Sequence, residues 1–402
     1  MQKKIAVDGL EPLGRGFAQA GVRIANERAV LTLIGLNPGS SNADLARLSG
    51  LGPQTTSRIV ADLETRELVR RGDVLRGRRG QPATPLFLDP DGAYVIGVEV
   101  GWRHFEVLLF AMSGQTLASV RRSYDYPDIA TIFAEVSAEV ATIRAGMTAR
   151  QADRLVGIGV ASPSHFERHL ARLGAPAEQV ALWRDVDVAD RVASATGLEV
   201  EWFNDGNAAC WSEFIARPVP RPNGLAYFQV GTLVGAGIAI DGSLWEGRTG
   251  NAANLGAILV SDAQGTPTYV HSVASILALQ QRLEAAGKSL PPGNPMNWDW
   301  EALEPVADAW LDDAGLALAV AVANTRAVME VDVTVIDGVM PRPVVQRLLD
   351  RVNHHLSELP AFGSDRPEVS IGHLGGSAAA TGAAQLVLFR RFFSRAWRLF
   401  AT

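Results

Sequence analysis

The chain has little cysteine and no long apolar run, and each absence narrows what the protein can be. Cys210 is the single cysteine among 402 residues, so neither an internal disulfide nor a zinc site that needs two or more thiolates can form. No stretch of about 18 consecutive apolar residues occurs. The first 16 residues also lack the apolar core of a signal peptide. We therefore expect a cytoplasmic protein that neither spans nor binds a membrane.

Length and charge predict two different folding units. A chain of 402 residues exceeds the size at which one hydrophobic core usually stops growing. The net charge is −6, but residues 1–85 carry +5 and the remainder carries −11. A basic unit joined to an acidic one indicates that the first meets a polyanion. Charge alone agrees equally well with arginine-rich helices that are merely solvated.

The basic unit contains three segments with helical patterns. Apolar residues recur with helical spacing from Val22 to Leu36. Ser41 and Asp44 can form a capping box at the start of a short second helix. Gly52 and Pro53 suit the N-cap and first position of a third helix. The first turns of this third helix carry polar types that bind base edges and phosphates in the major groove: Gln54, Thr55, Thr56, Ser57 and Arg58.

A hairpin and a basic strand are expected after the third helix. Leu68–Arg71 and Val74–Arg76 flank a Gly-Asp turn and predict the two strands of a wing. Gly77–Pro82 then favours an extended backbone that can enter a minor groove. The predicted DNA contacts here are Arg70, Arg71, Arg76, Arg78 and Arg79. A helical docking domain with a basic linker is the alternative, but this order of elements favours a winged helix-turn-helix over residues 1–85.

Residues 86–402 predict a larger α/β domain. Three β-rich runs, Tyr94–Gly101, Phe105–Gln115 and Leu117–Arg122, precede a helix near residues 131–144 and a buried strand at Leu155–Ala161. A second set of strands and helices follows. We expect two similar lobes, with their boundary near residue 205 and a ligand cleft between them.

The large domain resembles the ROK group of repressors, open reading frames and sugar kinases. The resemblance is carried by Leu155–Pro163, Ala181–Glu213, Val230–Gly256 and the segment LGGSAAATGAAQLVL near the end. It implies the actin-like ATPase (ribonuclease H-like) fold. The Gly-Arg-Arg-Gly-Gln-Pro-Ala joint is similar to that of the repressor branch.

The resemblance also implies the ligand-binding residues. In ROK kinases an Asn-Asp pair binds sugar hydroxyls and its aspartate acts as the base; here the pair is Asn204 and Asp205. Asn204 and Asp205 are equally expected to cap the helix that follows. Asn254 stands at the first position of the family's Glu-x-Gly-His motif. These three residues are the predicted effector contacts.

Other positions depart from the kinase pattern. The first phosphate loop, Asp-x-Gly-Gly-Thr in the family, reads Glu99–Arg103 with Trp102 where the backbone must approach a phosphate. The histidine of Glu-x-Gly-His is Ala257, and the cysteine-rich loop that follows has no cysteine. His271 in that loop is expected to be a surface or core residue. Asp337–Gly338 stands where the family has two glycines. We therefore predict no catalysis, no metal and no cofactor.

The sequence thus predicts a repressor of carbohydrate-metabolism genes whose kinase-like domain senses a sugar without phosphorylating it. Its partners would be a double-stranded DNA operator, a sugar effector and further copies of the chain, as a homodimer or a dimer of dimers. Two alternatives stay open. One is an active ROK sugar kinase with a DNA-binding extension, and the other is a DNA-binding protein that responds to no effector.

Overall fold

The computed structural model describes residues 19–73, 84–262, 264–360 and 366–394. The described residues form two compact units: those up to Asp89 together with residues 392–394, and those from Pro90 to Arg391. The expected division lies between residues 85 and 86, whereas the strand at residues 86–88 and residues 392–394 group with the first unit. No helix in the described part is long and apolar enough to cross a bilayer.

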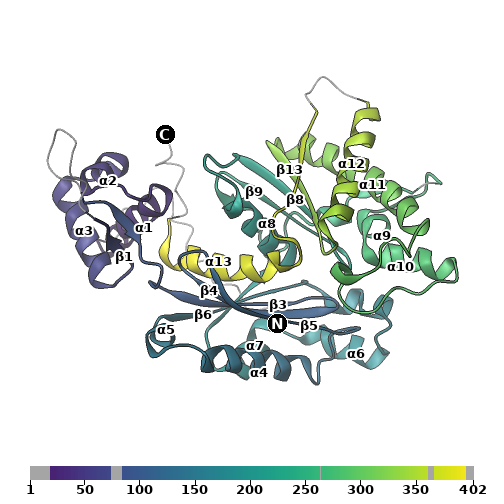
Figure 1. The fold of residues 1–402 in the computed structure, drawn as a ribbon, viewed down its shortest axis with the longest axis horizontal. Coiled ribbons are helices and arrows are strands. Elements are labelled where there is room, and N and C mark those ends of the chain that lie inside the picture. The colour runs from purple at the N-terminus through teal and green to yellow at the C-terminus, as the bar shows by residue number, and fades with distance from the viewer. Residues whose placement is uncertain (1–18, 74–83, 263, 361–365, 395–402) are drawn as a thin grey trace. The chain divides into compact units, whose positions relative to one another are not determined.

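The first unit is built from three helices and a two-stranded sheet (Figure 1). Ser41 and Asp44 form the predicted capping box: the Ser41 hydroxyl accepts the amide of Asp44 at 3.2 Å, and the Asp44 carboxylate accepts the amide of Ser41 at 3.1 Å. The third helix begins at Pro53 after Gly52, as expected. The elements are α1 (Gln19–Leu36), α2 (Asn42–Ser49), α3 (Pro53–Thr65), β1 (Val69–Arg71) and β2 (Leu86–Leu88).

In the described part of the chain, β1 pairs with β2 in antiparallel register, with Val69 opposite Leu88. The sequence pattern did not predict this strand at Leu86–Leu88. Its apolar residues suit a packed strand, since Leu86 is fully buried. The predicted wing strand Val74–Arg76 is not among the described residues, because residues 74–83, in the connection between β1 and β2, lie outside them.

The last described residues of the chain belong to the fold of the first unit. The Ser394 amide donates to the Thr32 hydroxyl at 2.8 Å, and that hydroxyl donates to the Arg28 carbonyl at 2.7 Å. A Cβ on Gly35 would lie 3.7 Å from the ring of Phe393, so this ring packs against α1. The sequence pattern did not predict this contact, since it joins residues more than 350 positions apart.

Two sheets of identical strand order form the second unit, as the predicted duplication requires. The first has the order β5-β4-β3-β6-β7 and the second β10-β9-β8-β13-β14. In each, antiparallel strands at one side join parallel strands at the other. The strands are β3 (Tyr94–Val100), β4 (His104–Ala111), β5 (Thr116–Ser123), β6 (Leu155–Ser162), β7 (Val200–Asn204), β8 (Gly224–Val230), β9 (Val234–Ile240), β10 (Ser243–Leu244), β13 (Val333–Gly338) and β14 (Glu368–Ile371).

Helices cover the two sheets and separate them. The first sheet and its helices form lobe one: α4 (Ile132–Ala145), α5 (Ala149–Asp153), α6 (Ala177–Leu182) and α7 (Val188–Thr196). Lobe two adds the ribbon β11 (Leu259–Ser261) with β12 (Pro267–Tyr269), and the helices α8 (Asp205–Ala216), α9 (Val270–Ala274), α10 (Ile276–Ala285), α11 (Val306–Met329) and α12 (Arg342–Glu358). The last helix, α13 (Ala378–Phe392), lies between the first sheet and α8 (Figure 1).

The position of α13 depends on glycines. A Cβ on Gly97 of β3 would lie 2.3 Å from the carbonyl oxygen of Ala380, and a Cβ on Gly159 of β6 would lie 2.3 Å from that of Ala383. On the opposite face, a Cβ on Gly382 would lie 1.8 Å from the Ala208 carbonyl oxygen of α8. The backbones touch directly, so side chains larger than hydrogen are excluded at these points.

We predict that Gly382→Ala destabilises the second unit by about 3 kcal/mol or more, because the methyl group must push α13 away from α8. The matched control is Gly146→Ala, where the nearest atom to an added Cβ is 3.5 Å away and a change within about 1 kcal/mol is expected. Chemical denaturation of the full chain measures both. Equal midpoints for the two variants would contradict the close contact.

Candidate functional site

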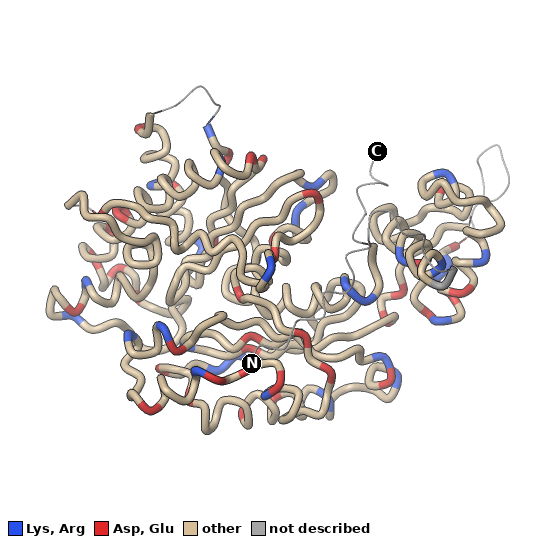
Figure 2. Tube along the Cα trace, turned by 180° about the vertical axis from the view of Figure 1, so that it is seen from behind, with Lys and Arg blue, Asp and Glu red and all other residues tan. Residues whose placement is uncertain are grey.

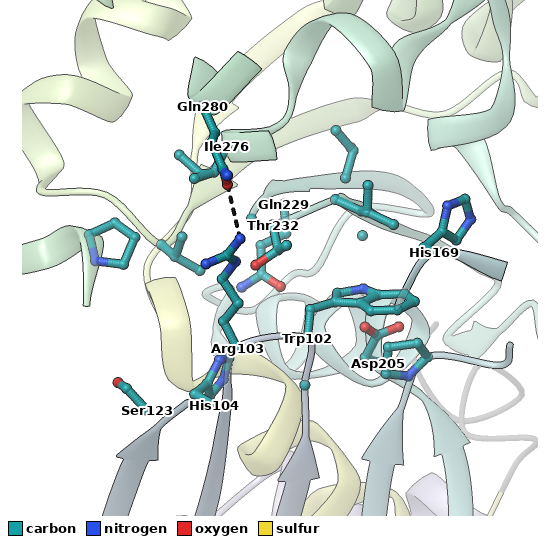
Figure 3. A pocket seen from close by; sticks show the side chains of 18 of the residues that line it. Trp102, Arg103, His104, Ser123, His169, Asp205, Gln229, Thr232, Ile276 and Gln280 are labelled. Carbon is teal, nitrogen blue, oxygen red and sulfur yellow. Dashed lines mark hydrogen bonds between the residues drawn. The ribbon is translucent and has the colours of Figure 1, made fainter. Parts of the chain in front are cut away.

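A cavity of about 670 Å³ lies between the lobes of the second unit (Figure 3). Its volume lies within the ordinary range for small-molecule sites. Side chains from both lobes line it, including Glu99, Trp102, Arg103, His104, Ser164, His169, Asn204, Asp205, Gln229, Thr232, Asn251, Asn254, His271 and Gln280. The three predicted effector residues, Asn204, Asp205 and Asn254, are therefore all brought to one cavity.

Asn204 and Asp205 stand where β7 ends and α8 begins. The Asn204 side chain caps the helix by accepting the amide of Asn207 at 3.1 Å, so the expected capping role is present. One oxygen of Asp205 accepts the amide of Gly206 at 2.8 Å and the side-chain amide of Asn204 at 3.1 Å. The carboxylate points into the cavity, as Figure 3 shows.

The protein environment disfavours the charged form of Asp205. Burial, and then the nearby charge of Glu99, raise the pKa of its carboxyl to about 7. Burial alone would also raise the pKa of Glu99, but His104 at 3.2 Å, and then Arg121, hold it below its ordinary value. Asp205 is thus a carboxyl group that exchanges its proton near neutral pH, beside a carboxylate that stays charged.

Ser164 and Asn251 are among the cavity residues that were not predicted from the sequence as effector contacts. The Ser164 hydroxyl donates to the Asn251 side chain at 2.8 Å and accepts from the Asn204 side chain at 3.4 Å. Ser164 follows β6 directly, and the carboxyl ends of parallel strands are where ligands bind in open α/β sheets. That rule would have found Ser164. No local pattern distinguished Asn251.

Trp102 and Arg103 occupy the first phosphate loop. The indole of Trp102 points into the cavity (Figure 3) and makes edge contacts with Phe166 and His169, with centroid distances of 5.0 and 5.7 Å. Arg103 reaches from lobe one to lobe two and donates to the Gln280 side chain at 2.9 Å. Trp102 and Arg103 therefore place bulky side chains at the two positions that are Gly and Thr in the kinase pattern.

His271 is partly buried, as expected, and it also lines the cavity, which the sequence did not reveal. Its ring fills the space over Gly256, where an added Cβ would lie 2.2 Å from it. Burial lowers the pKa of His271 to about 4, so the ring is neutral at neutral pH. Its Nδ1 accepts the amide of Val234 at 3.2 Å, which places the proton on Nε2.

Asp337, near the end of β13, stands at a position where the ROK family has a glycine. Its carboxylate accepts the amides of Gly338 at 2.8 Å and Gly375 at 2.9 Å, and a Cβ on Gly372 would lie 2.3 Å from it. Burial raises the pKa of this carboxyl. A separate cavity of about 380 Å³ adjoins Asp337. The backbone amides of Gly338 and Gly375 beside this cavity are thus already bound to a side chain of the protein itself.

The glycine turn after β8 has a structural role. The carbonyls of Gly231 and Thr232 accept the amides of Ile276 and Leu277 at the start of α10, at 2.9 and 3.3 Å. The first amides of α10 are therefore satisfied by the turn.

In the first unit, α3 presents most of the predicted DNA contacts. Gln54, Ser57 and Arg58 are exposed and Thr55 is partly exposed. Thr56 is a wrong prediction: it is fully buried, and its hydroxyl donates to the Gly52 carbonyl at 3.3 Å. Gly52 provides no side-chain cap. The first free amides of α3 are therefore open to a phosphate.

The arginines of the first unit differ in their availability. Arg71 is held by both carboxylate oxygens of Glu64, at 2.6 and 2.8 Å. Arg70 lies over the ring of Phe87, 5.3 Å from its centroid, and no ion pair to Arg70 or Arg58 is found among the described residues. Figure 2 shows acidic positions interspersed with the basic ones in this unit. Arg76, Arg78 and Arg79 lie outside the described residues.

The fold and the cavity define a class of protein: a winged-helix unit joined to a two-lobed domain of the actin-like sugar-kinase fold. Residues 95–390 match the ROK family, and residues 23–80 match the MarR family. The chain belongs to the ROK family. Its domain composition is that of a DNA-binding transcriptional regulator of that family.

Similar proteins include regulators and enzymes. An uncharacterised protein of Sinorhizobium fredii, y4fQ, is 28% identical over 92% of both chains. The xylose repressor of Bacillus subtilis is 21% identical over 60% of this chain and 62% of its own length. N-acetylmannosamine kinase of Vibrio cholerae is 30% identical over 43% of this chain and 61% of its own length.

Solved structures show the same fold. A ROK family transcriptional regulator described as a homologue of the Escherichia coli MLC protein has a TM-score of 0.67 at 20% identity, over 94% of this chain and 97% of that one. A ROK glucokinase of Streptomyces griseus has a TM-score of 0.58 at 21% identity, and the match covers 73% of this chain and 99% of that one. The match to the regulator thus extends over the winged-helix unit as well.

We predict that Asp205→Asn changes how stability depends on pH. Because folding raises the pKa of Asp205 from 3.8 to about 7, the folded protein binds the proton more tightly, and the wild type loses stability as pH rises from about 4 to 7. Asparagine keeps the acceptor for Gly206 without the charge. The variant should gain stability relative to wild type above pH 7, by up to about 4 kcal/mol, and little below pH 4. Calorimetric unfolding across this range measures it; a constant difference would contradict the raised pKa.

Proposed function

We propose that this protein is a sugar-responsive transcriptional repressor that binds a pseudo-palindromic operator as a homodimer or a dimer of dimers and does not phosphorylate its ligand. The observation that carries the proposal is the combination, in one chain, of a winged-helix unit with an open helix start and a ROK domain in which Trp102, Arg103 and Asp337 stand at nucleotide-binding positions of the family.

Binding to DNA is supported by the geometry of α3. Its first turn combines exposed Gln54, Ser57 and Arg58 with uncapped backbone amides after Gly52. Side chains of these types read base edges, and free amides at a helix start bind phosphates. Two copies related by a two-fold axis would place two such helices on half-sites separated by one or more helical turns.

Binding of a sugar is supported by the polar groups that converge in the cavity. Asn204, Asp205, Ser164 and Asn251 form a connected hydrogen-bond network at its floor. Trp102 adds an aromatic face, and this mixture suits a ligand with hydroxyl groups on an apolar ring. The similar proteins agree, since their names refer to xylose, N-acetylmannosamine and glucose.

The absence of catalysis is supported on the nucleotide side. Trp102 and Arg103 replace the small residues that let a loop approach phosphates, and the Asp337 carboxylate occupies the amides of Gly338 and Gly375. A negative group there would repel a phosphate.

One observation favours the rival function, an active sugar kinase. A carboxyl group with a pKa of about 7, as Asp205 has, is well matched to act as a general base at neutral pH. A base alone transfers no phosphate, because the donor must also be held in line.

We predict that the purified protein transfers no phosphate from ATP to glucose, xylose or N-acetylmannosamine, because Trp102, Arg103 and Asp337 change the positions at which the family binds a nucleotide. A coupled assay for ADP measures this, with Asp205→Asn as the reference for background. Turnover in the wild type that Asp205→Asn abolishes would establish the kinase instead.

We predict that Arg58→Gln weakens operator binding by about 1 kcal/mol or more, about fivefold, because Arg58 is exposed on α3 without an ion-pair partner among the described residues. The matched control is Arg66→Gln at the end of α3, whose guanidinium is bound to Glu27 at 3.1 Å. Fluorescence anisotropy on an operator mapped by genomic selection compares them at several salt concentrations. Equal losses of affinity for the two variants would show that the first turns of α3 do not lie in a DNA groove.

A further inference from the structure

We propose that the cavity takes an anionic sugar derivative whose phosphate or carboxylate group lies at the end lined by His169 and His271. This inference rests on the proposed sensing function of the same cavity. It adds the charge of the ligand and the residues that recognise it.

The two histidines face one another from opposite lobes. His169 lies in lobe one between the short 3₁₀ turns Phe166–Arg168 and Leu170–Leu173, and His271 lies in α9 of lobe two. Their ring centroids are 6.4 Å apart, and both rings line the cavity. A small oxyanion held between them would contact both lobes at once.

Both rings have hydrogen-bonding capacity that the protein leaves unused. The Nδ1 atom of His271 accepts the Val234 amide, so its Nε2 carries a proton that can be donated. The Nδ1 atom of His169 is buried and has no hydrogen-bond partner among the described residues. The described part of the protein therefore does not fix the tautomer of this ring, and either nitrogen of His169 can carry the proton.

Positive charge dominates at this end of the cavity. Burial lowers the pKa of His169, and the charges of Arg172 and Arg168 lower it further. Burial also lowers the pKa of His271, and the charges of His169 and Arg172 add to the effect. The facing carboxylate, Glu167, lies 3.7 Å from Arg168 and 3.5 Å from His165. An anion here would be attracted by the arginines and by the imidazole N–H groups.

The other end of the cavity is less suited to an anion. Arg103 is a cation at that end, but the negative charges of Asp125 and Glu284 act on its guanidinium group. Asp205, in turn, needs hydroxyl donors. A sugar ring beside Trp102 would therefore direct its hydroxyl groups to Asp205 and its anionic group to His169, whose ring is 5.7 Å from the indole.

The experiment is isothermal titration of the full-length protein with matched probes. Glucose, xylose and N-acetylmannosamine are each compared with a phosphorylated form, and glucose also with glucuronate, so that phosphate and carboxylate are separate arms. At least one anionic form should bind tenfold or more tightly than its neutral parent. His169→Gln and His271→Gln should each reduce that preference to about threefold or less. The preference is the ratio of the two affinities, so each variant serves as its own reference for binding of the neutral parent.

Two further variants separate recognition from folding. Arg168→Gln changes a side chain that is 66% exposed, so it removes charge without disturbing the core and should also reduce the preference. His354→Gln, on the exposed face of α12, should leave it unchanged. The proposal is overturned if every neutral sugar binds as tightly as its anionic form, if no anionic form binds, or if the three cavity variants keep the preference.

The same samples test the proposed function separately. Operator binding is measured with and without each probe. A protein that binds no operator contradicts the regulator itself. A protein whose operator binding responds to a neutral sugar alone supports the regulator and overturns only the anionic ligand.

Discussion

The structure of the second unit depends on the direct backbone contact that α13 makes with the first sheet and with α8. The contact is possible because Gly97, Gly159 and Gly382 have no side chains at the three points of closest approach. Backbones in van der Waals contact cannot slide past one another without losing many contacts together. The helix pair therefore holds the first residue of α8, Asp205, at a fixed place beside the carboxyl ends of β3 and β6. The close contact therefore sets where the polar groups at the floor of the cavity lie.

The same helix also connects the cavity to the DNA-binding unit through the chain itself. The chain passes between the two units twice, after Asp89 and after Arg391, and the second passage is the continuation of α13. Within the first unit, Phe393 and Ser394 pack against α1. A ligand can bias a regulator only if it binds two arrangements with different affinity. Helix α13 contacts α8 in the second unit, and the residues that follow it pack against α1 in the first.

Local signals in the sequence were reliable, and signals that depend on distant residues were not. The capping box of Ser41 and the start of α3 at Pro53 follow from chemistry within a few residues, and both are present. The partner of β1 lies 15 residues or more away, and an apparent turn at Gly72 concealed it. Thr56 was placed on the wrong face because polarity suggests exposure, whereas its helical phase directs it inward with Ile59 and Val60. Cavity residues such as Asn251 are brought to the site by the topology, which no single segment encodes.

The relation between the two halves of the cavity argues for a sensor rather than an impaired enzyme. The sugar side keeps a connected polar floor, with Asp205 near its titration point. On the nucleotide side the substitutions do more than remove donors, since the Asp337 carboxylate binds the amides of Gly375 and Gly338. An enzyme that had merely lost one group would have unpaired amides there, at a cost of about 1–3 kcal/mol for each buried one. These internal hydrogen bonds support the proposal of a sensor, in which the binding energy of a ligand shifts the protein between arrangements instead of driving a reaction.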